Sequence, residues 1–286
     1  MTIASFDLLQ PRSLEEAVAL LQQYGDDSRP LGGGTTLIIL LKQRVVRYRV
    51  LVDLQSIPDL ADIRRDPEGV RIGALATHRK IETSELIRES FPALAYAFSQ
   101  IGNVRVRQTA SVGGNLAHGD YRLDPPPPLL VLNAAVHLFG PDGARTVPIR
   151  EFFTGTYETA LRPGELVTSI KVPFAPANSR ANYLRYSALS ANDWPCLGVA
   201  AYLSSTNGRC QELRLALGGL APTPLLIDRL DFVIGQALDR PVVDKVLDTI
   251  DEQISPVADL RGSEWYKRRM ARVFVKKALD QLNGHG

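Results

Sequence analysis

The sequence predicts an α+β fold, and three observations support this prediction. The first ~55 residues alternate as strand, helix and strand, with three consecutive glycines where a strand gives way to a helix. Mixed strand and helix patterns continue to about residue 175. A hairpin pattern followed by two helices then fills the remainder. We therefore expect domains at 1–55, 56–175 and 176–286.

The first part begins with a helix over residues 13–24. Ser13 is its expected N-cap, because Glu16 follows three residues later and apolar residues then recur at helical spacing. The elements expected next are a strand over 28–31, a glycine loop over 32–34, a second helical pattern, and an alternating strand over 48–54.

The middle part has a second glycine loop, Ala110-Ser111-Val112-Gly113-Gly114-Asn115. Its expected strands and helices are a strand over 70–72, helices over 81–89 and 92–100, and strands over 136–139 and 166–172. Pro173 ends the last strand, since proline cannot donate to a sheet ladder. Residues 173–179 are the expected linker.

The C-terminal part predicts a three-stranded antiparallel sheet with helices. Asn207-Gly208 is the strongest hairpin signal in the chain. The expected elements are strands over 183–187, 198–204 and 211–217 and helices over 241–254 and 263–282. The last helix carries a basic face that is either solvated or docks on the acidic surface of a partner subunit or on a membrane-associated acceptor. This face is made of Lys267, Arg268, Arg269, Arg272, Lys276 and Lys277.

Composition excludes several classes of protein. A net charge of +2 over 286 residues is too small for an electrostatic nucleic-acid footprint. The longest aliphatic run, Leu37–Leu41, is far shorter than the roughly 20 residues that span a bilayer. Cys196 and Cys210 supply neither a disulfide framework nor a metal-ligand set. The expectation is a cytoplasmic globular protein without a metal site, membrane span or nucleic-acid partner.

The two glycine loops carry the chemical signal. A strand that turns through glycines into a helix leaves main-chain N–H groups unpaired at the positive end of the helix, where a diphosphate can approach. The first loop lacks the lysine of a Walker loop, and Leu37 takes the last glycine position of the dinucleotide fingerprint. Each loop alone is also compatible with an ordinary tight turn. Two of them in one α+β region favour a dinucleotide held at both phosphates.

These loops belong to a series of motifs that resembles a known family, the FAD-binding medium subunits of molybdenum hydroxylases, relatives of xanthine dehydrogenase and carbon monoxide dehydrogenase. The series covers essentially the whole chain. It comprises Gly32–Leu37, Ala110–Asn115, Asp124, Phe152–Gly155, Leu161–Val167, Leu217–Pro224 and Asp259–Ser263.

The resemblance implies the two-lobed FAD fold of the vanillyl-alcohol oxidase type plus a C-terminal α+β domain. It also implies an electron-transfer oxidoreductase subunit that does not itself act on the substrate. The expected partners are a large molybdopterin subunit and a small subunit with two [2Fe-2S] clusters, in a heterotrimer that pairs into a dimer of heterotrimers. In such an assembly the FAD is expected to pass electrons to an external acceptor.

The resemblance also implies the residues that contact FAD. For the diphosphate and ribityl these are Arg29, Leu31, Gly32, Gly33, Gly34, Thr35, Thr36 and Leu37. For the second clamp they are Ala110, Ser111, Gly113, Gly114 and Asn115. The others are Ile101 near the flavin ring, Asp124 bonded to the cofactor, Leu166 near adenine or ribose, Arg185 in place of a family lysine, and His118.

Trp194 stands where many relatives carry tyrosine or phenylalanine, an aromatic residue that stacks on or gates one flavin face. From the residues alone, Asp124 also fits a turn, Trp194 a core aromatic, and His118 a position away from the cofactor. His78 is interpreted as a surface or hydrogen-bonded core group. Two other functions stay open, namely a stand-alone FAD oxidoreductase with its own small-molecule substrate and a flavin-binding module without turnover.

Overall fold

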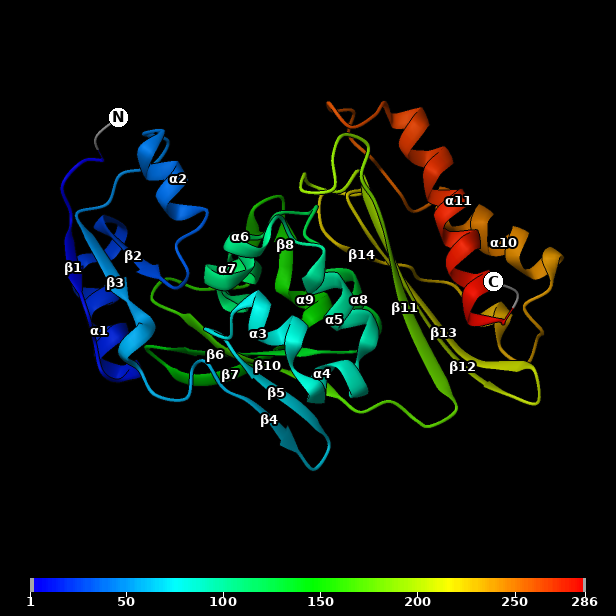
Figure 1. Ribbon diagram of the computed structural model, residues 1–286, viewed down its shortest axis with the longest axis horizontal. Helices are drawn as coiled ribbons and strands as arrows, with labels where there is room; N and C mark the ends of the chain where they lie inside the picture. The colour runs from blue at the N-terminus through cyan, green and yellow to red at the C-terminus, as the bar shows by residue number, and fades with distance from the viewer. Residues whose placement is uncertain (1–2, 285–286) are drawn as a thin grey trace.

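The computed structural model describes residues 3–284. Within that range the chain builds a three-stranded, a five-stranded and a four-stranded sheet in sequence order, with a short β8–β9 ribbon inserted between β7 and β10 of the five-stranded sheet. Figure 1 shows these parts side by side from the blue N-terminal end to the red C-terminal helices. The mixture of helices and strands confirms the predicted α+β class.

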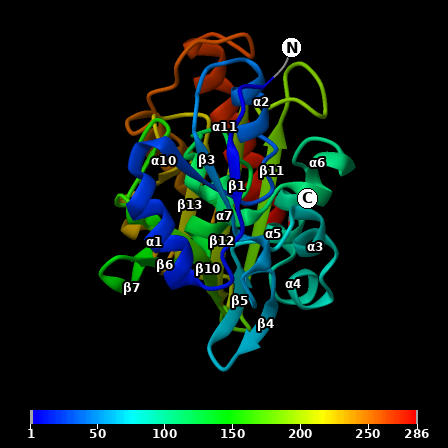
Figure 2. The same cartoon turned by 90° about the vertical axis from the view of Figure 1, so that its left-hand side faces the viewer.

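The N-terminal part is a parallel sheet with β3 at its centre, in the order β1-β3-β2. Its elements are β1 (Asp7–Leu9), α1 (Leu14–Tyr24), β2 (Ser28–Leu31), α2 (Leu37–Lys42) and β3 (Val50–Asp53). The Ser13 hydroxyl accepts a hydrogen bond from the Glu16 N–H at 3.1 Å, as the N-cap prediction requires. Strand β1 was not predicted, because it is only three residues long and its residues are half-buried or exposed. Figure 2 looks at this end of the molecule, with β1 and β3 in front.

The five-stranded sheet has the order β4-β5-β10-β6-β7, and each neighbouring pair is antiparallel. Its strands are β4 (Ile63–Asp66), β5 (Gly69–Gly73), β6 (Ala135–Gly140), β7 (Gly143–Pro148) and β10 (Leu166–Pro173), with the ribbon β8 (Phe153–Gly155) and β9 (Glu158–Thr159). Helices cover the face of the sheet that is uppermost in Figure 1: α3 (His78–Thr83), α4 (Glu85–Ser90), α5 (Pro92–Ser99), α6 (Val104–Thr109), α7 (Val112–His118), α8 (Pro126–Val131) and α9 (Ile149–Phe152).

The helix predicted over 81–89 is wrong in its extent. The structure has two short helices there, α3 and α4, which meet at Ser84. Ser84 has extended backbone angles, and its hydroxyl accepts a hydrogen bond from the Ile87 N–H at 3.4 Å. Serine competes with the helix for such bonds and therefore starts a new helix here.

The C-terminal part is an antiparallel sheet in the order β11-β12-β13-β14. Its elements are β11 (Ser179–Tyr186), β12 (Leu197–Thr206), β13 (Arg209–Gly218), β14 (Leu225–Leu226), α10 (Arg240–Asp251) and α11 (Glu264–Leu282). Asn207 and Gly208 have φ of 52° and 74°, as the predicted tight hairpin turn requires. The predicted sheet lacked the two-residue strand β14, which is too short to give a periodic signal.

This sheet lies between two helical layers. Helices α5 and α8 of the middle part pack on one side of it, and α11 packs on the other. Tyr183, Ala200 and Tyr202 of the sheet therefore belong to the same buried cluster as the middle-part helices. The two parts share a core, which holds the β11–β12 loop in place beside the middle part. Among residues 3–284, no helix combines the length and apolarity needed to cross a membrane.

The basic face predicted for the last helix is wrong at one position. The side chain of Lys267 is 1% exposed, and its ammonium lies 2.9 Å from Asp259 Oδ1. Lys267 belongs to the buried stripe of α11, together with Ala271, Val275 and Ala278. Its neighbours Arg268, Arg272 and Lys276 pair with acidic residues of this same chain. The solvated-face interpretation therefore fits this helix better than docking.

Candidate functional site

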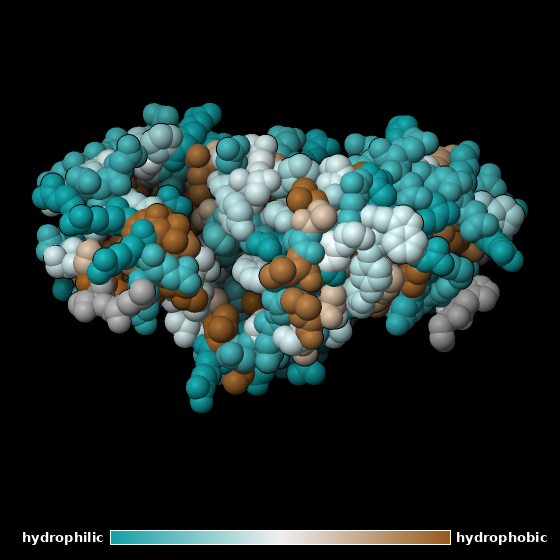
Figure 3. All heavy atoms as spheres, turned by 90° about the horizontal axis from the view of Figure 1, so that it is seen from above, coloured by the Kyte–Doolittle hydropathy of each residue, from teal (hydrophilic) through white to brown (hydrophobic). Residues whose placement is uncertain are grey.

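A cavity of about 1440 Å³ lies where the N-terminal part meets the middle part. Its walls include the two glycine loops, residues 161–167 and the β11–β12 loop, together with shorter contributions from other segments of all three parts. Figure 3 shows the surface hollowed beside the N-terminal part when the molecule is seen from above. Pockets for drug-sized ligands enclose roughly 300–1,000 Å³, so this larger cavity has room for a dinucleotide-sized ligand.

The first glycine loop follows the carboxyl end of β2. Gly34 has a φ of +67°, a conformation that glycine adopts without strain. Among residues 3–284, the N–H groups of Gly33, Gly34, Thr35 and Thr36 donate to no other main-chain group. Buried or half-buried N–H groups require an acceptor, and a row of free ones suits an anion. The first loop thus provides the free donors that its sequence predicted.

The second glycine loop has a different local structure from the one predicted. Helix α6, not a strand, precedes it. The first-turn N–H groups of α7 are already bonded: Val112 to Ala76 O at 3.1 Å, Gly113 to Ala74 O at 2.7 Å, and Gly114 to Ser111 Oγ at 3.3 Å. The prediction of free N–H groups is therefore wrong for this loop, because α7 docks its first turn on residues 74–76.

Close packing against neighbouring segments, not the approach of a ligand, explains Gly33 and Gly113. A Cβ added to Gly33 would lie 1.9 Å from Thr109 O, and one added to Gly113 would lie 2.6 Å from Ala74 Cβ. Gly114 differs, since its added Cβ meets only Ser111 Oγ, at 3.1 Å. Gly114 is exposed and lines the cavity. It is the glycine of this loop whose bare surface a ligand would meet.

Asn115 lies beside Gly114 on the cavity wall. Its Oδ1 is buried and receives no hydrogen bond within the described part of the chain. Such orphaned acceptors are rare in folded proteins and are destabilising by about 1–3 kcal/mol. A ligand donor or an ordered water at this wall would complete the bonding of the carboxamide.

Asp124 joins the cavity to the C-terminal sheet. Its Oδ1 accepts hydrogen bonds from the Tyr183 hydroxyl at 2.7 Å and from Arg185 Nε at 2.9 Å. Burial raises the pKa of Asp124 to about 6, although the charge of Arg185 and the two hydrogen bonds act in the opposite direction. With Oδ1 held in this way, the other carboxylate oxygen is the one left for a ligand.

His118, at the end of α7, forms a further part of the wall. Its ring lies 5.2 Å from that of Tyr157, centroid to centroid. Burial lowers the pKa of His118, the neighbouring Arg122 and Arg29 lower it further, and Asp120 opposes them. The imidazole is therefore neutral at pH 7 and has one N–H to donate and one nitrogen to accept.

Every site residue nominated from the sequence lines this one cavity. The first segment contributes Arg29, Leu31, Gly32, Gly33, Gly34, Thr35, Thr36 and Leu37; the second contributes Ala110, Ser111, Gly113, Gly114, Asn115 and His118. Ile101, Asp124, Leu166, Arg185 and Trp194 complete the set. Residues from all three parts of the chain therefore converge on one concave surface.

Comparison with known proteins identifies the family. The domain described as "FAD binding domain in molybdopterin dehydrogenase" matches residues 4–175, and the "CO dehydrogenase flavoprotein C-terminal domain" matches residues 182–282. The chain belongs to the molybdopterin dehydrogenase flavoprotein family.

Members of this family match nearly the full length of the chain. The carbon monoxide dehydrogenase medium chain of Afipia carboxidovorans is 35% identical over 98% of both chains. The glyceraldehyde dehydrogenase medium chain of Sulfolobus acidocaldarius is 31% identical over 97% of this chain and 98% of its own. The solved carbon monoxide dehydrogenase of Hydrogenophaga pseudoflava has a chain that is 34% identical, with a TM-score of 0.96 over 100% of this chain and 99% of its own. As a member of the family, the chain is an oxidoreductase subunit with an FAD-binding domain.

The residues present in the cavity fit FAD. The free N–H groups of the first loop suit a diphosphate, and the orphaned Asn115 Oδ1 offers an acceptor beside the second loop. The volume leaves room for both the nucleotide and the flavin ring. These observations of the structure agree with the cofactor that the family carries.

Several cavity residues of this flavoprotein were missed from the sequence. They include His78, Tyr157, Asp193 and residues 161–165. The motif Leu161–Val167 was visible, but only Leu166 was nominated from it. Tyr157 has a φ of +61°, an uncommon backbone conformation for a non-glycine residue, and no sequence pattern reveals it.

His78 was interpreted as a surface or hydrogen-bonded core residue; the core position is confirmed, but the expected hydrogen bonds of the ring are absent among the described residues. It is 1% exposed, and neither ring nitrogen has a hydrogen-bond partner among the described residues. Its ring instead packs against Phe98, with 5.3 Å between the ring centroids. Burial lowers the pKa of His78 to about 4; the nearby backbone of Ser111 acts in the opposite direction, and the charge of Arg107 adds a smaller lowering.

His78 is expected to make the protein sensitive to acid. Between its ordinary pKa of 6.5 and about 4, the unfolded chain binds a proton that the folded chain excludes. Stability therefore falls as the pH falls through this range, by about 3 kcal/mol for a buried group of this pKa. Urea denaturation at a series of pH values measures the slope. The variant His78→Phe is expected to lose less stability than the unchanged protein over the same range; equal slopes would contradict this assignment.

Proposed function

We propose that this chain is the electron-transfer subunit of a molybdenum hydroxylase. In this role it receives electrons from [2Fe-2S] clusters of a small partner subunit and passes them to an external acceptor. One observation carries the proposal. Medium chains of enzymes named for carbon monoxide and for glyceraldehyde match this chain over nearly its whole length. Because those two substrates are chemically unlike, the role that the medium chains share is not the reaction with the substrate.

In this proposal the cavity residues bind and orient FAD, which supplies one- and two-electron redox chemistry when bound. The N–H groups of Gly33 to Thr36 donate to the diphosphate, and the Ser111 hydroxyl and the Asn115 side-chain N–H donate to it from the second loop. Ile101 packs near the flavin ring, and Leu166 lies on the adenine or ribose side. Trp194 covers one face of the ring.

The proposal includes the wider assembly expected from the sequence. A large molybdopterin subunit and a small iron–sulfur subunit complete a heterotrimer, which pairs into a dimer of heterotrimers in the cytoplasm. Within this chain, residues 1–55 and 56–175 form the two FAD-binding lobes, and residues 176–286 form the C-terminal domain. Substrate specificity then resides in the large subunit.

Isolation of the chain from its native source tests this assembly. We expect it to copurify with one larger and one smaller chain and with FAD, molybdenum and iron. Mass spectrometry, metal analysis and the visible spectrum report each component. A yellow protein that purifies alone and turns over a small-molecule substrate would instead identify a stand-alone FAD oxidoreductase.

The substitution Gly114→Val is expected to abolish FAD retention while leaving the fold intact. The valine side chain would project from the exposed face of Gly114 into the cavity, where only Ser111 Oγ lies within contact distance. Glycine inside a helix is destabilising by about 0.5–1 kcal/mol relative to alanine, so replacing it does not by itself weaken helix α7. The ratio of flavin to protein absorbance measures retention, with Gly114→Ala as the smaller control. Full retention of FAD by the valine variant would disprove the second-clamp assignment.

A further inference from the structure

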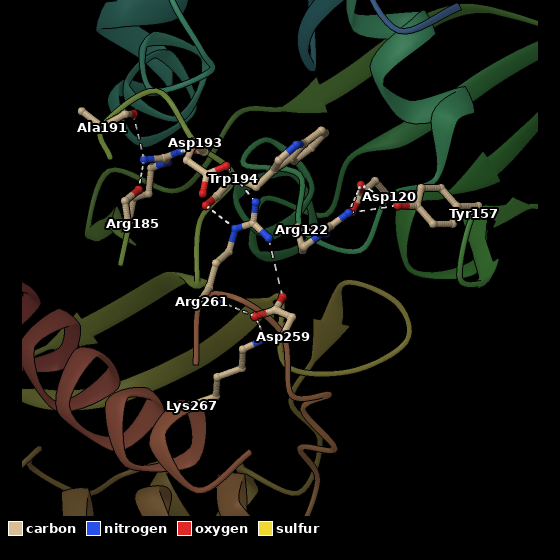
Figure 4. A network of polar contacts seen from close by, with 11 residues as sticks. Asp120, Arg122, Tyr157, Arg185, Ala191, Asp193, Trp194, Asp259, Arg261 and Lys267 are labelled. Carbon is tan, nitrogen blue, oxygen red and sulfur yellow. Dashed lines mark hydrogen bonds and ion pairs between the residues drawn. The ribbon is translucent and has the colours of Figure 1, made fainter. Parts of the chain in front are cut away.

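The β11–β12 loop, residues 187–196, carries Trp194 from the C-terminal sheet to the cavity. Its main-chain carbonyls are held by two arginines outside the loop. Arg185 donates to Ala191 O at 3.2 Å and also to Asp193 O, and Arg261 Nε donates to Trp194 O at 3.1 Å. Figure 4 shows both guanidinium groups directed at the loop. The position of the indole is thus set by side chains that belong to other segments.

Arg261 is itself held rigidly by the C-terminal domain. Its guanidinium pairs with Asp193 Oδ1 at 2.7 Å, and its main-chain N–H donates to Asp259 Oδ1 at 2.8 Å. Asp259 in turn pairs with the buried ammonium of Lys267 at 2.9 Å. Arg261 is only 10% exposed, so its ion pair is weakly screened by solvent. The Arg261 guanidinium also lies 3.7 Å from Asp259 Oδ2, so a chain of ion pairs connects helix α11 to the loop on which Trp194 sits.

Arg122 approaches the same indole from the middle part of the chain. Its guanidinium carbon lies 5.2 Å from the Trp194 ring centroid, within the range of a cation–π interaction. A bidentate pair with Asp120, at 3.0 and 2.8 Å, fixes the guanidinium. Asp120 is 1% exposed and also accepts a hydrogen bond from the Tyr157 hydroxyl. Arg122 does not line the cavity itself, so it acts through Trp194.

We propose that Arg122 and Arg261 are positioning residues that clamp Trp194 at the wall of the cavity from two sides, one from the middle part and one from the C-terminal domain. Through this clamp, the C-terminal domain helps to set the position of Trp194 and so closes one side of the cavity. Only the identity of the ligand, FAD, rests on the proposed function; the clamp is a property of the protein alone. Replacing either arginine is expected to free the indole while leaving every residue of the two glycine loops unchanged.

Tryptophan fluorescence measures the clamp without any cofactor. The chain has two tryptophans, and Trp265 is 68% exposed on α11. The variant Trp265→Phe therefore leaves Trp194 as the only tryptophan, whose emission is separated from that of the tyrosines by selective excitation. In the FAD-free protein, Arg261→Ala, Asp193→Asn and Arg122→Gln are each expected to red-shift the emission. Trp194 is already 37% exposed. Each variant should also raise the acrylamide quenching constant roughly twofold, as local opening exposes the ring further.

Matched variants separate positioning from general destabilisation. Arg269→Ala removes an exposed arginine of α11 that has no bond to the loop, and it is expected to change nothing. Arg261→Lys retains a charge for Asp193 and is expected to restore part of the protection. Near-ultraviolet circular dichroism checks the folding of every variant. Unchanged Trp194 emission in the folded Arg261→Ala, Asp193→Asn and Arg122→Gln variants would overturn the clamp.

Titration with FAD keeps the two proposals distinct. FAD is expected to quench Trp194 emission in the Trp265→Phe protein, and flavin release is expected to be faster when Arg261 or Arg122 is replaced. A failure of the protein to bind FAD would refute the cofactor part of the proposed function. The fluorescence result on the FAD-free protein would still decide the clamp.

Discussion

Replacing Gly33 by alanine is expected to remove FAD from the protein and to lower its free energy of unfolding by about 1–3 kcal/mol, the usual effect of overpacking. The added methyl group would lie 1.9 Å from the main-chain oxygen of Thr109, a distance that real contacts do not reach. The obstacle is main chain, so no side-chain rotation can relieve it. The first loop must therefore move away from the second, and its free N–H groups move with it.

The control for this variant is Gly114→Ala, in the second loop. Its added Cβ meets only a serine hydroxyl at 3.1 Å, so its stability is expected to stay close to that of the unchanged protein. Urea denaturation and the flavin-to-protein absorbance ratio measure the two effects separately. If Gly33→Ala kept both its FAD and its stability, the close packing of the two loops would be refuted.

Replacing Asp124 by alanine is expected to destabilise the protein by about 3–5 kcal/mol, because it leaves a buried arginine without its counter-ion. The Arg185 side chain is 5% exposed and has Asp124 as its acidic partner, at 2.9 Å. The buried Tyr183 hydroxyl loses its acceptor in the same variant. The effect reaches the cavity as well, since Arg185 also holds the loop that carries Trp194.

Tyr183→Phe is the matched control for Asp124, because it removes one hydrogen bond and leaves the ion pair in place. Its expected effect is about 0.5–1.5 kcal/mol. Thermal and urea unfolding compare the two variants directly. Equal effects would show that the ion pair contributes nothing beyond the hydrogen bond, contrary to the role we give it.

Local patterns were enough to predict much of the fold. Ser13 and the Asn207-Gly208 turn were identified because each acts on the backbone within a few residues of itself. The break between α3 and α4 at Ser84 also depends on local backbone interactions, but it was not predicted because both flanking segments have a helical pattern. The buried Lys267 was misplaced because its charge was given more weight than its spacing. It lies four residues before Ala271 and eight before Val275, on the buried stripe of α11.

The site was predictable as a set of residues, but the physical roles of those residues were not. The glycine motifs identified both loops, yet the reason for Gly33 lies in Thr109, a residue from a different part of the chain. Asp124 meets Tyr183 and Arg185 only after the C-terminal sheet has packed on the middle part. No spacing in the sequence reveals such a contact. The Arg122–Trp194 interaction has the same origin.

The central claim is that this chain holds FAD but receives its electrons from partner subunits. The flavin absorbance of the purified chain, followed under anaerobic conditions, tests it most directly. We predict that the flavin of the isolated chain stays oxidised when the substrate of the assembled enzyme is added, and that it bleaches once the two partner chains are restored. Bleaching of the isolated chain by that substrate, without partners, would contradict the claim.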